Sequence, residues 1–363
     1  MITFRFIYSF FGYIAAFLWS IITERAFLIL RVDDIEKCNQ RTAEFAYDPR
    51  YINWTFPWDI DRSIYECTLL PYNDERTRCP NKTMLINLNK TSVELKIRHK
   101  LSVNDDHPVI GIRNLFRNED LKSLLDAYDS DMFLLCTNRG VTLKMFENPY
   151  HGDYLRSLGL RPETAFPCLF QYLFKINNEV CVDGCKVTEQ RLVSVGEDTI
   201  RLGLMVRHSR LFKEHLTCLE SLVYTYQSQG KRVLILTVTE SIDIQHAMRK
   251  RYDHDMLLFP AGDTQPIITV HDRSDKDKDC QDKQNEDRMA MLHSARDLYL
   301  LSLTDVHVVS GSSGFGIMGA MMRPRLNPVV YKAGAHRICN ESLGGDSLKQ
   351  FGDDWSGFRH SRL

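Results

Sequence analysis

Two polar clusters in the chain have the residue types and spacing to bind an anionic ligand. Arg207, His208 and Arg210 directly follow the apolar run 202–206. A guanidinium group presents a planar fork of N–H donors that fits a phosphate. The second cluster, the Ser/Gly-rich segment 310–314, follows another apolar run and precedes a helical pattern, and free N–H groups at a helix N-terminus also bind phosphate. A surface salt bridge at the first cluster and ordinary helix capping at the second are the alternatives.

Other catalytic patterns are absent or badly placed. The sequence has no Walker loop, HExxH or GxSxG motif, and no Cys and His spacing that is typical of zinc sites. Asp59-Ile-Asp61 and Asp129-Ser-Asp131 match the bare Asp-x-Asp pattern, which a metal-dependent sugar-nucleotide enzyme needs after a core strand. Asp131 comes before a strand instead, so we interpret both pairs as solvated turn residues and expect no metal site.

The elements that must position the two clusters alternate between strand and helix patterns. In the second half we expect strands at 200–206, 233–238, 256–259, 267–270, 306–309 and 328–331, with helices at 214–227, 289–303 and 316–322 and one that starts after Ser241. The charge run 272–288 is expected to be a solvated loop. Such alternation favours a mostly parallel sheet, and open sheets of this kind bind ligands at the carboxyl ends of their strands.

The first half repeats the pattern less clearly. We expect strands at 26–30, 109–113 and 132–136, helices at 118–128 and 164–174, and a linker at 176–189. The chain is therefore expected to be an α/β protein with two facing Rossmann-like domains. The predicted limits are 1–190 for the N-terminal domain, 191–345 for the C-terminal domain that binds the ligand, and 346–363 for a tail.

Length and charge agree with a two-domain globular enzyme. The chain has 363 residues, and its 46 basic and 47 acidic residues give a net charge of −1. A nucleic-acid-binding surface normally needs a basic excess, so we expect no nucleic-acid partner.

Four Asn-x-Ser/Thr sequons predict a protein of the secretory-pathway lumen that is glycosylated at one or more of them. They are Asn53, Asn81, Asn89 and Asn340, and the first three lie in the stretch 48–106, which has no clear periodic pattern. The ten cysteines agree with that compartment. Cys181 and Cys185 are spaced for a small disulfide loop, but unpaired or differently paired thiols fit equally well.

The N-terminal segment supports two interpretations. Residues 6–23 carry no charge over 18 positions, which is just enough for a membrane anchor or the apolar part of a signal peptide. However, an apolar strand pattern at 26–30 follows almost at once, with no polar stem between them. The segment therefore also fits a first core helix that is packed on all sides.

Several segments, in this order, resemble the fucosyltransferase superfamily. They are 24–30 with 51–54, then 166–174, then Gly203–Arg207, and finally 298–305 with 312–316. The most similar patterns are those of the plant cell-wall and the α1,6 or nodulation-type enzymes. This resemblance implies a GT-B fold, GDP-fucose as the donor substrate with no other cofactor, inversion at the anomeric carbon and no metal.

The resemblance also implies roles for particular residues. Arg207 would be the catalytic residue that holds the donor β-phosphate, and His208 would lie on the same donor side. Residues Ser312, Ser313, Phe315 and Gly316 would surround the phosphates and the nucleoside. Asp297 would recognise guanine, because a carboxylate can accept hydrogen bonds from N1–H and N2–H together.

We therefore predict a glycosyltransferase that transfers fucose to a glycan hydroxyl in the Golgi or secretory-pathway lumen, as a single-pass type II membrane protein if residues 6–23 are an anchor. The family's usual Gly-rich loop before the first helix is missing, since only 9–14 stand there. Two alternatives therefore stay open: a non-catalytic, truncated relative that binds glycan or nucleotide, and a GT-B enzyme for another sugar nucleotide.

Overall fold

The chain divides into two compact units. The computed structural model describes residues 2–24, 26–27, 29, 46–54, 83–87, 92–98, 110–111, 117–126, 132–136, 142–162, 164–206, 212–260, 280–310, 314–322, 329–333 and 339. One unit, here the C-terminal unit, comprises 1–7, 42–48 and 170–352, and the other, the N-terminal unit, comprises 8–41, 49–169 and 353–363. The domain limits that the sequence suggests stay a prediction.

The C-terminal unit is built on a five-stranded parallel sheet, as the alternating pattern predicted. Its strands are β7 (Thr199–Val206), β8 (Arg232–Thr239), β9 (Leu257–Leu258), β10 (Val306–Ser310) and β11 (Val329–Ala333). They follow the order β11-β10-β7-β8-β9, and every pair is parallel. All the strands predicted in this half, apart from 267–270, which lies outside the described residues, are confirmed.

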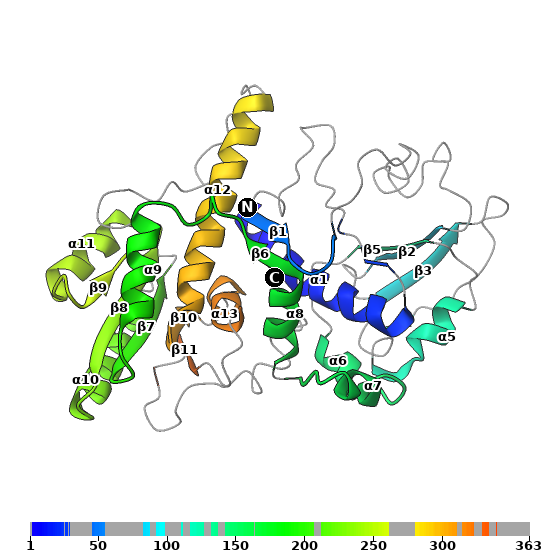
Figure 1. Cartoon of the computed structure of the whole chain (residues 1–363), viewed down its shortest axis with the longest axis horizontal. Helices are drawn as coiled ribbons and strands as arrows, with labels where there is room; N and C mark the ends of the chain where they lie inside the picture. The colour runs from blue at the N-terminus through cyan, green and yellow to red at the C-terminus, as the bar shows by residue number, and fades with distance from the viewer. Residues whose placement is uncertain are drawn as a thin grey trace. The chain divides into compact units, whose positions relative to one another are not determined.

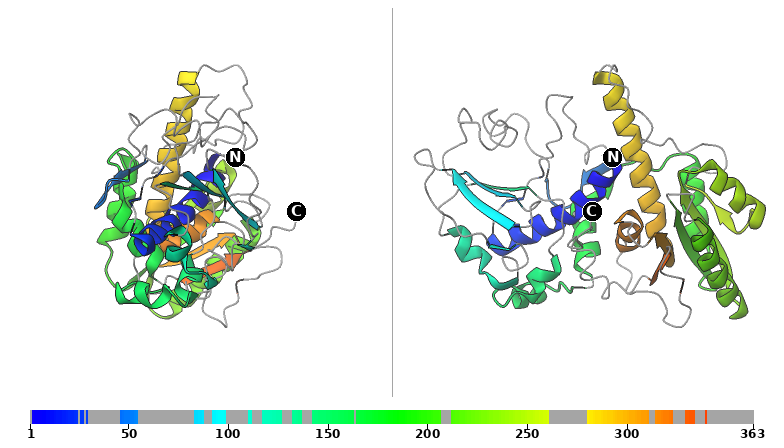
Figure 2. Two further views of the ribbon diagram at one scale, coloured as in Figure 1. Left: turned by 90° about the vertical axis from the view of Figure 1, so that its right-hand side faces the viewer. Right: turned by 180° about the vertical axis from the view of Figure 1, so that it is seen from behind.

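Helices pack on both faces of this sheet (Figure 1). The unit contains α9 (Gly184–Ser194), α10 (Phe212–Ser228), α11 (Ile242–Arg251), α12 (Cys280–Ser302) and α13 (Gly314–Met321). Leu202, Leu204 and Val206 of β7 are buried in one core with Cys218 and Leu219 of α10. Successive side chains of a strand point to opposite faces. The position between them, Gly203, accordingly lies against Leu301 of α12. Figure 2 shows the same arrangement from behind, with α10 and α12 on opposite sides of the strands.

A charged pair joins the amino ends of β7 and β10. The guanidinium of Arg201 donates from Nε to Asp305 Oδ2 at 2.8 Å and from Nη2 to Asp305 Oδ1 at 3.0 Å. The backbone N–H of Arg201 donates to Asp305 Oδ2 as well, at 3.0 Å. A bidentate pair of this kind fixes the plane of the guanidinium relative to the plane of the carboxylate, and it therefore helps to hold the two strands in register.

Two segments of this unit differ from the sequence prediction. Residues 176–189 were expected to be a linker, but α9 occupies Gly184–Ser194, and Cys181 and Cys185 form a disulfide at its start. Its buried residues are Cys185, Thr188 and Leu192, and these give little apolar periodicity. Thr188 Oγ1 donates to the Phe259 carbonyl at 2.9 Å, and the Tyr299 hydroxyl donates to the Glu189 carboxylate.

Helix α12 begins at Cys280, nine residues before the predicted start at 289. The end of the charge run that was expected to be a loop is therefore helical. Gln, Lys, Glu and Arg are good helix formers, and residues 280–288 contain neither Gly nor Pro. Asn285 and Arg288 are exposed, so this part of the helix is solvated, as the charges predicted.

The N-terminal unit contains a mixed sheet. Its strands β2 (Thr83–Asn87), β3 (Ser92–Arg98), β4 (Ile110–Gly111) and β5 (Met132–Cys136) follow the order β4-β3-β2-β5. Strands β2 and β5 are parallel, as expected for a Rossmann-like domain, whereas β2–β3 and β3–β4 are antiparallel. Only four residues connect β2 to β3, and so short a connection allows only an antiparallel pair. The sequence did not predict these two strands.

Helix α1 (Ile2–Thr23) precedes this sheet, and α5 (Leu121–Asp126), α6 (Thr142–Glu147), α7 (Gly152–Ser157) and α8 (Ala165–Leu173) follow it or lie within it along the chain. Phe10, Ile14 and Leu18 of α1 are fully buried, and buried side chains occur all around the helix from residue 10 onward. This burial is what the core-helix alternative predicts. Within the described part of the chain, no helix combines the length and the apolar character needed to cross a membrane.

A small two-stranded sheet completes the C-terminal unit. It pairs β1 (Tyr47–Pro49) with β6 (Phe174–Ile176). The ring of Tyr47 is fully buried and makes edge contacts with Phe170 and Phe174, at centroid distances of 5.6 and 5.8 Å. Aromatic packing therefore holds this distant segment of the chain to the unit.

Candidate functional site

The carboxyl ends of β7 and β10 lie side by side. The register pairs Val306 with Leu202 and Val309 with Met205, so Val206 and Ser310 end neighbouring strands at the same edge. The connections that leave this edge, 207–211 and 311–313, carry both polar clusters. Arg207, His208, Arg210, Ser312 and Ser313 themselves lie outside the described residues. The fold thus brings together the strand ends from which both clusters leave.

Helix α13 begins directly after the Ser/Gly-rich cluster, and its close approach to β10 explains its glycines. All eight of its residues are buried, including Phe315 and Gly316. A Cβ atom on Gly316 would lie 2.5 Å from Val309 Cγ1 and 2.7 Å from Val309 Cβ. Only glycine lets the first turn of the helix approach the strand this closely, so the sequence at this position fixes where the helix N-terminus lies.

Asp297 lies on α12 and is bound to its neighbour. Arg296 donates from Nε and from Nη2 to Asp297 Oδ1, each at 3.0 Å, and both side chains are at most 10% exposed. Burial raises the pKa of Asp297, which the Arg296 charge opposes. Glu240 repels the carboxylate and also raises its pKa, so Asp297 lies near Glu240, the residue that follows β8. The predicted guanine ligand is therefore on the carboxyl side of the sheet, although one of its oxygens is already engaged by Arg296.

One polar pair at this edge was not predicted from the sequence. His215 Nε2 of α10 lies 3.0 Å from Ser310 Oγ, and His215 is completely buried. Alternation along β10 contains a signal that could have found it. Val306 and Val308 face α10, so the residue two positions further, Ser310, must face the same helix.

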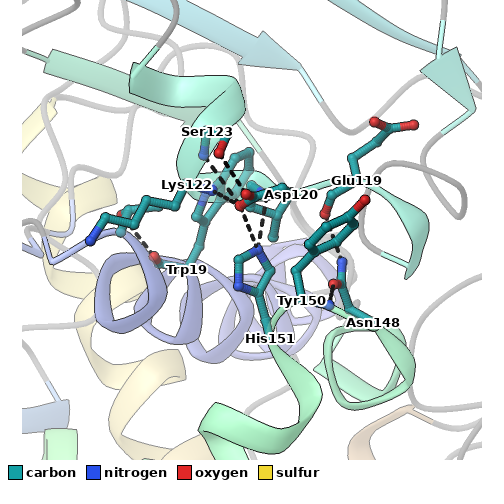
Figure 3. Close-up of polar contacts among 10 residues, drawn as sticks. Trp19, Glu119, Asp120, Lys122, Ser123, Asn148, Tyr150 and His151 are labelled. Atoms are coloured by element: carbon teal, nitrogen blue, oxygen red, sulfur yellow. Dashed lines mark hydrogen bonds and ion pairs between the residues drawn. The ribbon is translucent and has the colours of Figure 1, made fainter.

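The N-terminal unit contains a second cluster of polar side chains that were not predicted (Figure 3). His151 Nε2 accepts a hydrogen bond from the backbone N–H of Leu121 at 2.9 Å. Asp120 Oδ1 accepts from the backbone N–H groups of Lys122 and Ser123, at 3.1 and 3.2 Å. Both side chains therefore cap the first turn of α5.

The geometry of this second cluster gives it a structural role. Burial lowers the pKa of His151, although the Asp120 charge opposes this, so the ring is neutral in the acceptor form that the cap requires. Its Nε2 lone pair is used by the Leu121 N–H. Asn148 Nδ2 also donates to the Glu119 carbonyl at 2.8 Å, which holds the loop before α7 against the start of α5. The cluster is not arranged to accept a proton from a substrate.

The residues described by the structure contain no group of three or more His, Cys, Asp or Glu side chains that could hold a metal ion. Of the predicted glycosylation sites, Asn53 is exposed, and Asn81, Asn89 and Asn340 lie outside the described residues.

Comparison with known proteins agrees with this geometry. No protein-family model matches the chain. Over 318 residues the chain is 27% identical to the Arabidopsis thaliana protein named "Putative fucosyltransferase 10", an alignment that covers 83% of this chain. The chain spans only 58% of the length of that relative.

Solved structures give the fold. A mutant of Arabidopsis thaliana FUT1 in complex with GDP superposes with a TM-score of 0.60 at 16% identity, covering 93% of this chain and 70% of that one. The fold is GT-B. The fucosyltransferase NodZ from Bradyrhizobium matches at 12% identity over 91% of this chain and 93% of that one, with a TM-score of 0.48. The FUT1 superposition confirms the predicted fold class, and the similarity to the Arabidopsis relative confirms the predicted resemblance to fucosyltransferases.

We expect Gly316→Ala to destabilise the C-terminal unit, because its new methyl group collides with Val309. Overpacking of this kind costs about 1–3 kcal/mol, which thermal unfolding will detect as a lower melting temperature. A matched control is Gly196→Ala, whose Cβ would meet nothing closer than Asp198 Oδ1 at 3.9 Å. If both variants melt like the wild type, α13 does not lie against β10 as described.

Proposed function

We propose that this chain is a glycosyltransferase that transfers fucose from GDP-fucose to a hydroxyl group of a glycan. The observation that carries the proposal is the register of β7 with β10. Because of this register, the connections that contain Arg207 and Ser312 begin at neighbouring strand ends. The chain is also similar to the plant protein named "Putative fucosyltransferase 10" over most of its own length. A nucleotide diphosphate needs donors from more than one loop, and this edge supplies two.

Different residues at this edge bind different parts of the donor in the proposal. In the proposal, Arg207 binds the β-phosphate through its guanidinium fork, with His208 beside it on the donor side. Ser312, Ser313 and the N-terminal N–H groups of α13, at Phe315 and Gly316, surround the phosphates. Asp297, which is near the end of β8, accepts hydrogen bonds from guanine through the oxygen that Arg296 does not use.

The proposed reaction is a direct displacement that inverts the anomeric carbon. The acceptor hydroxyl oxygen forms a bond to C1 of fucose as the bond from C1 to the β-phosphate oxygen breaks, and GDP leaves with that electron pair. The acceptor proton passes to a base or to water. Negative charge grows on the leaving phosphate, and the fixed positive charge of Arg207 stabilises it without a divalent metal.

Replacing Arg207 tests the proposal. We expect Arg207→Ala to lower the rate of fucose transfer by about 10²–10³-fold, the effect of losing one preorganised charge donor, and to weaken GDP binding. Arg207→Lys will recover little, because an ammonium group cannot form the bidentate contact. Arg210→Ala, in the same connection, is the matched control and will have a smaller effect. The measurements are turnover with GDP- and UDP-sugars, with and without a chelator, and GDP affinity.

Three outcomes contradict the proposal in different ways. If Arg207→Ala binds GDP as tightly as the wild type does, the assignment of Arg207 to the donor site is wrong. Tight GDP binding by the wild type without turnover on any glycan would favour the non-catalytic alternative. Loss of activity on adding a chelator, restored by manganese, would contradict the metal-free mechanism.

We also propose that the protein works in the lumen of the secretory pathway. The Cys181–Cys185 and Cys218–Cys339 disulfides support this compartment, because cytosolic thiols are kept reduced. So does the exposed position of Asn53. For protein made in eukaryotic cells, glycosidase treatment should lower the apparent mass on a gel. Asn53→Gln should make that shift smaller if this site is used. A protein that shows no shift and is recovered from the cytosol would contradict this proposal.

A further inference from the structure

The buried pair of His215 and Ser310 connects the two segments to which the proposed function assigns phosphate binding. His215 lies in the first turns of α10, just after the connection 207–211, and Ser310 is the last residue of β10, just before 311–313. Their side chains meet at 3.0 Å between Nε2 and Oγ. One hydrogen bond therefore joins the first turn of α10 to the last residue of β10.

The surroundings of the pair make this contact well defined. His215 is 0% exposed and Ser310 is 9% exposed, so water does not compete for the hydrogen bond. Cys218 and Leu219, on the next turn of α10, lie in the same core as Val306 and Val308 of β10. The helix and the strand are thus fixed against each other by apolar packing, and the polar contact lies at the carboxyl end of that packed face.

The apolar core alone does not explain a polar pair here. A buried hydroxyl or imidazole costs free energy unless it is hydrogen-bonded, and an apolar pair of similar shape would pack equally well. What the pair adds is direction, because a hydrogen bond fixes Oγ relative to the ring within a few tenths of an ångström and a narrow range of angles. That direction is set at the residue from which the Ser/Gly-rich connection leaves the sheet.

We propose that His215 and Ser310 are positioning residues for the donor site, which fix the start of α10 against the end of β10 at the edge where the nucleotide diphosphate is proposed to bind. This inference rests on the proposed function. Neither side chain needs to touch the donor. The pair acts by fixing the start of α10 against the end of β10. Preorganisation of this kind determines how well fixed charges stabilise a transition state.

The chain supplies a matched control at the other end of the same strand. Thr304 Oγ1 lies 3.3 Å from Nδ1 of His307, and both residues are buried. Burial lowers the pKa of His307 to about 3, so this ring is neutral. Both pairs are buried contacts between a hydroxyl and an imidazole, although Thr304 Oγ1 also donates to the Leu301 carbonyl at 2.7 Å. The Thr304 pair is at the amino end of β10, away from the edge that holds the connections.

The experiment compares Ser310→Ala, Ser310→Thr, His215→Leu, the double variant His215→Leu/Ser310→Ala and the control Thr304→Val in the full chain. The measurements are the melting temperature, the GDP dissociation constant, and kcat and KM with GDP-fucose. We expect Thr304→Val, which loses the contacts with both His307 and the Leu301 carbonyl, to lower the melting temperature at least as much as Ser310→Ala. We expect only Ser310→Ala to weaken GDP binding, by about tenfold, and to lower kcat with little change in the acceptor KM. Ser310→Thr keeps the hydroxyl and should bind GDP like the wild type.

The double variant identifies the cause. If the two side chains act through their mutual contact, His215→Leu, Ser310→Ala and the double variant will each lose about the same tenfold of GDP affinity. Losses that multiply to about a hundredfold would mean independent roles and would overturn the inference, as would a Ser310→Ala affinity within twofold of the wild type. An equal loss of GDP affinity in Thr304→Val would show general destabilisation and would also overturn it.

Failure of the proposed function gives a different result. A wild-type chain that does not bind GDP removes the donor site and this inference together. A wild-type chain that binds GDP, with unchanged affinity in Ser310→Ala and His215→Leu, removes only the positioning role.

Discussion

The parallel register of β7 against β10 is the constraint on which the C-terminal unit depends. Arg201 and Asp305 fix it at the amino end of the two strands, with contacts of 2.8 and 3.0 Å. His215 and Ser310 join α10 to the last residue of β10 at the other end. A shift of one residue would turn every side chain of a strand to the opposite face, so the register also decides which residues leave the sheet at its carboxyl edge.

The two faces of these strands do different work. On one face, Leu202, Leu204 and Val308 pack with α10, and each fully buried side chain of this kind contributes about 1.5–3 kcal/mol. On the other face, small residues allow close approach. Gly203 lies against Leu301 of α12, and Gly316 of α13 lies against Val309. The apolar face gives rigidity, and the glycine-containing face places the N-terminus of α13 beside the end of β10.

The sequence predicted this sheet because its strands are continuous apolar runs separated by clear helix signals. It did not predict β2 and β3, because these strands of a mixed sheet carry polar side chains among the apolar ones. It did not predict α9 either, because tertiary contacts such as the hydrogen bond from Thr188 to the Phe259 carbonyl hold this helix in place. Within the candidate site, the sequence predicts Arg207 and the Ser/Gly-rich segment from their positions after strands and Asp297 from family resemblance, and their roles in donor binding stay predictions. His215 was not predicted, because its partner Ser310 is 95 residues away in the sequence and only the alternation along β10 indicates that Ser310 faces α10. The His151 cap of α5 was missed for the same reason, since its partner is 30 residues distant.

The central claim is that the carboxyl edge of β7 and β10 binds a guanosine diphosphate sugar, and hydrogen–deuterium exchange of the full chain with and without GDP tests it directly. We expect GDP to slow exchange in peptides that cover 206–215 and 310–317, while exchange at the amino end of β10 and around His151 stays unchanged. UDP at the same concentration should give little protection. Protection confined to other segments, or none in either peptide at saturating GDP, would contradict the account.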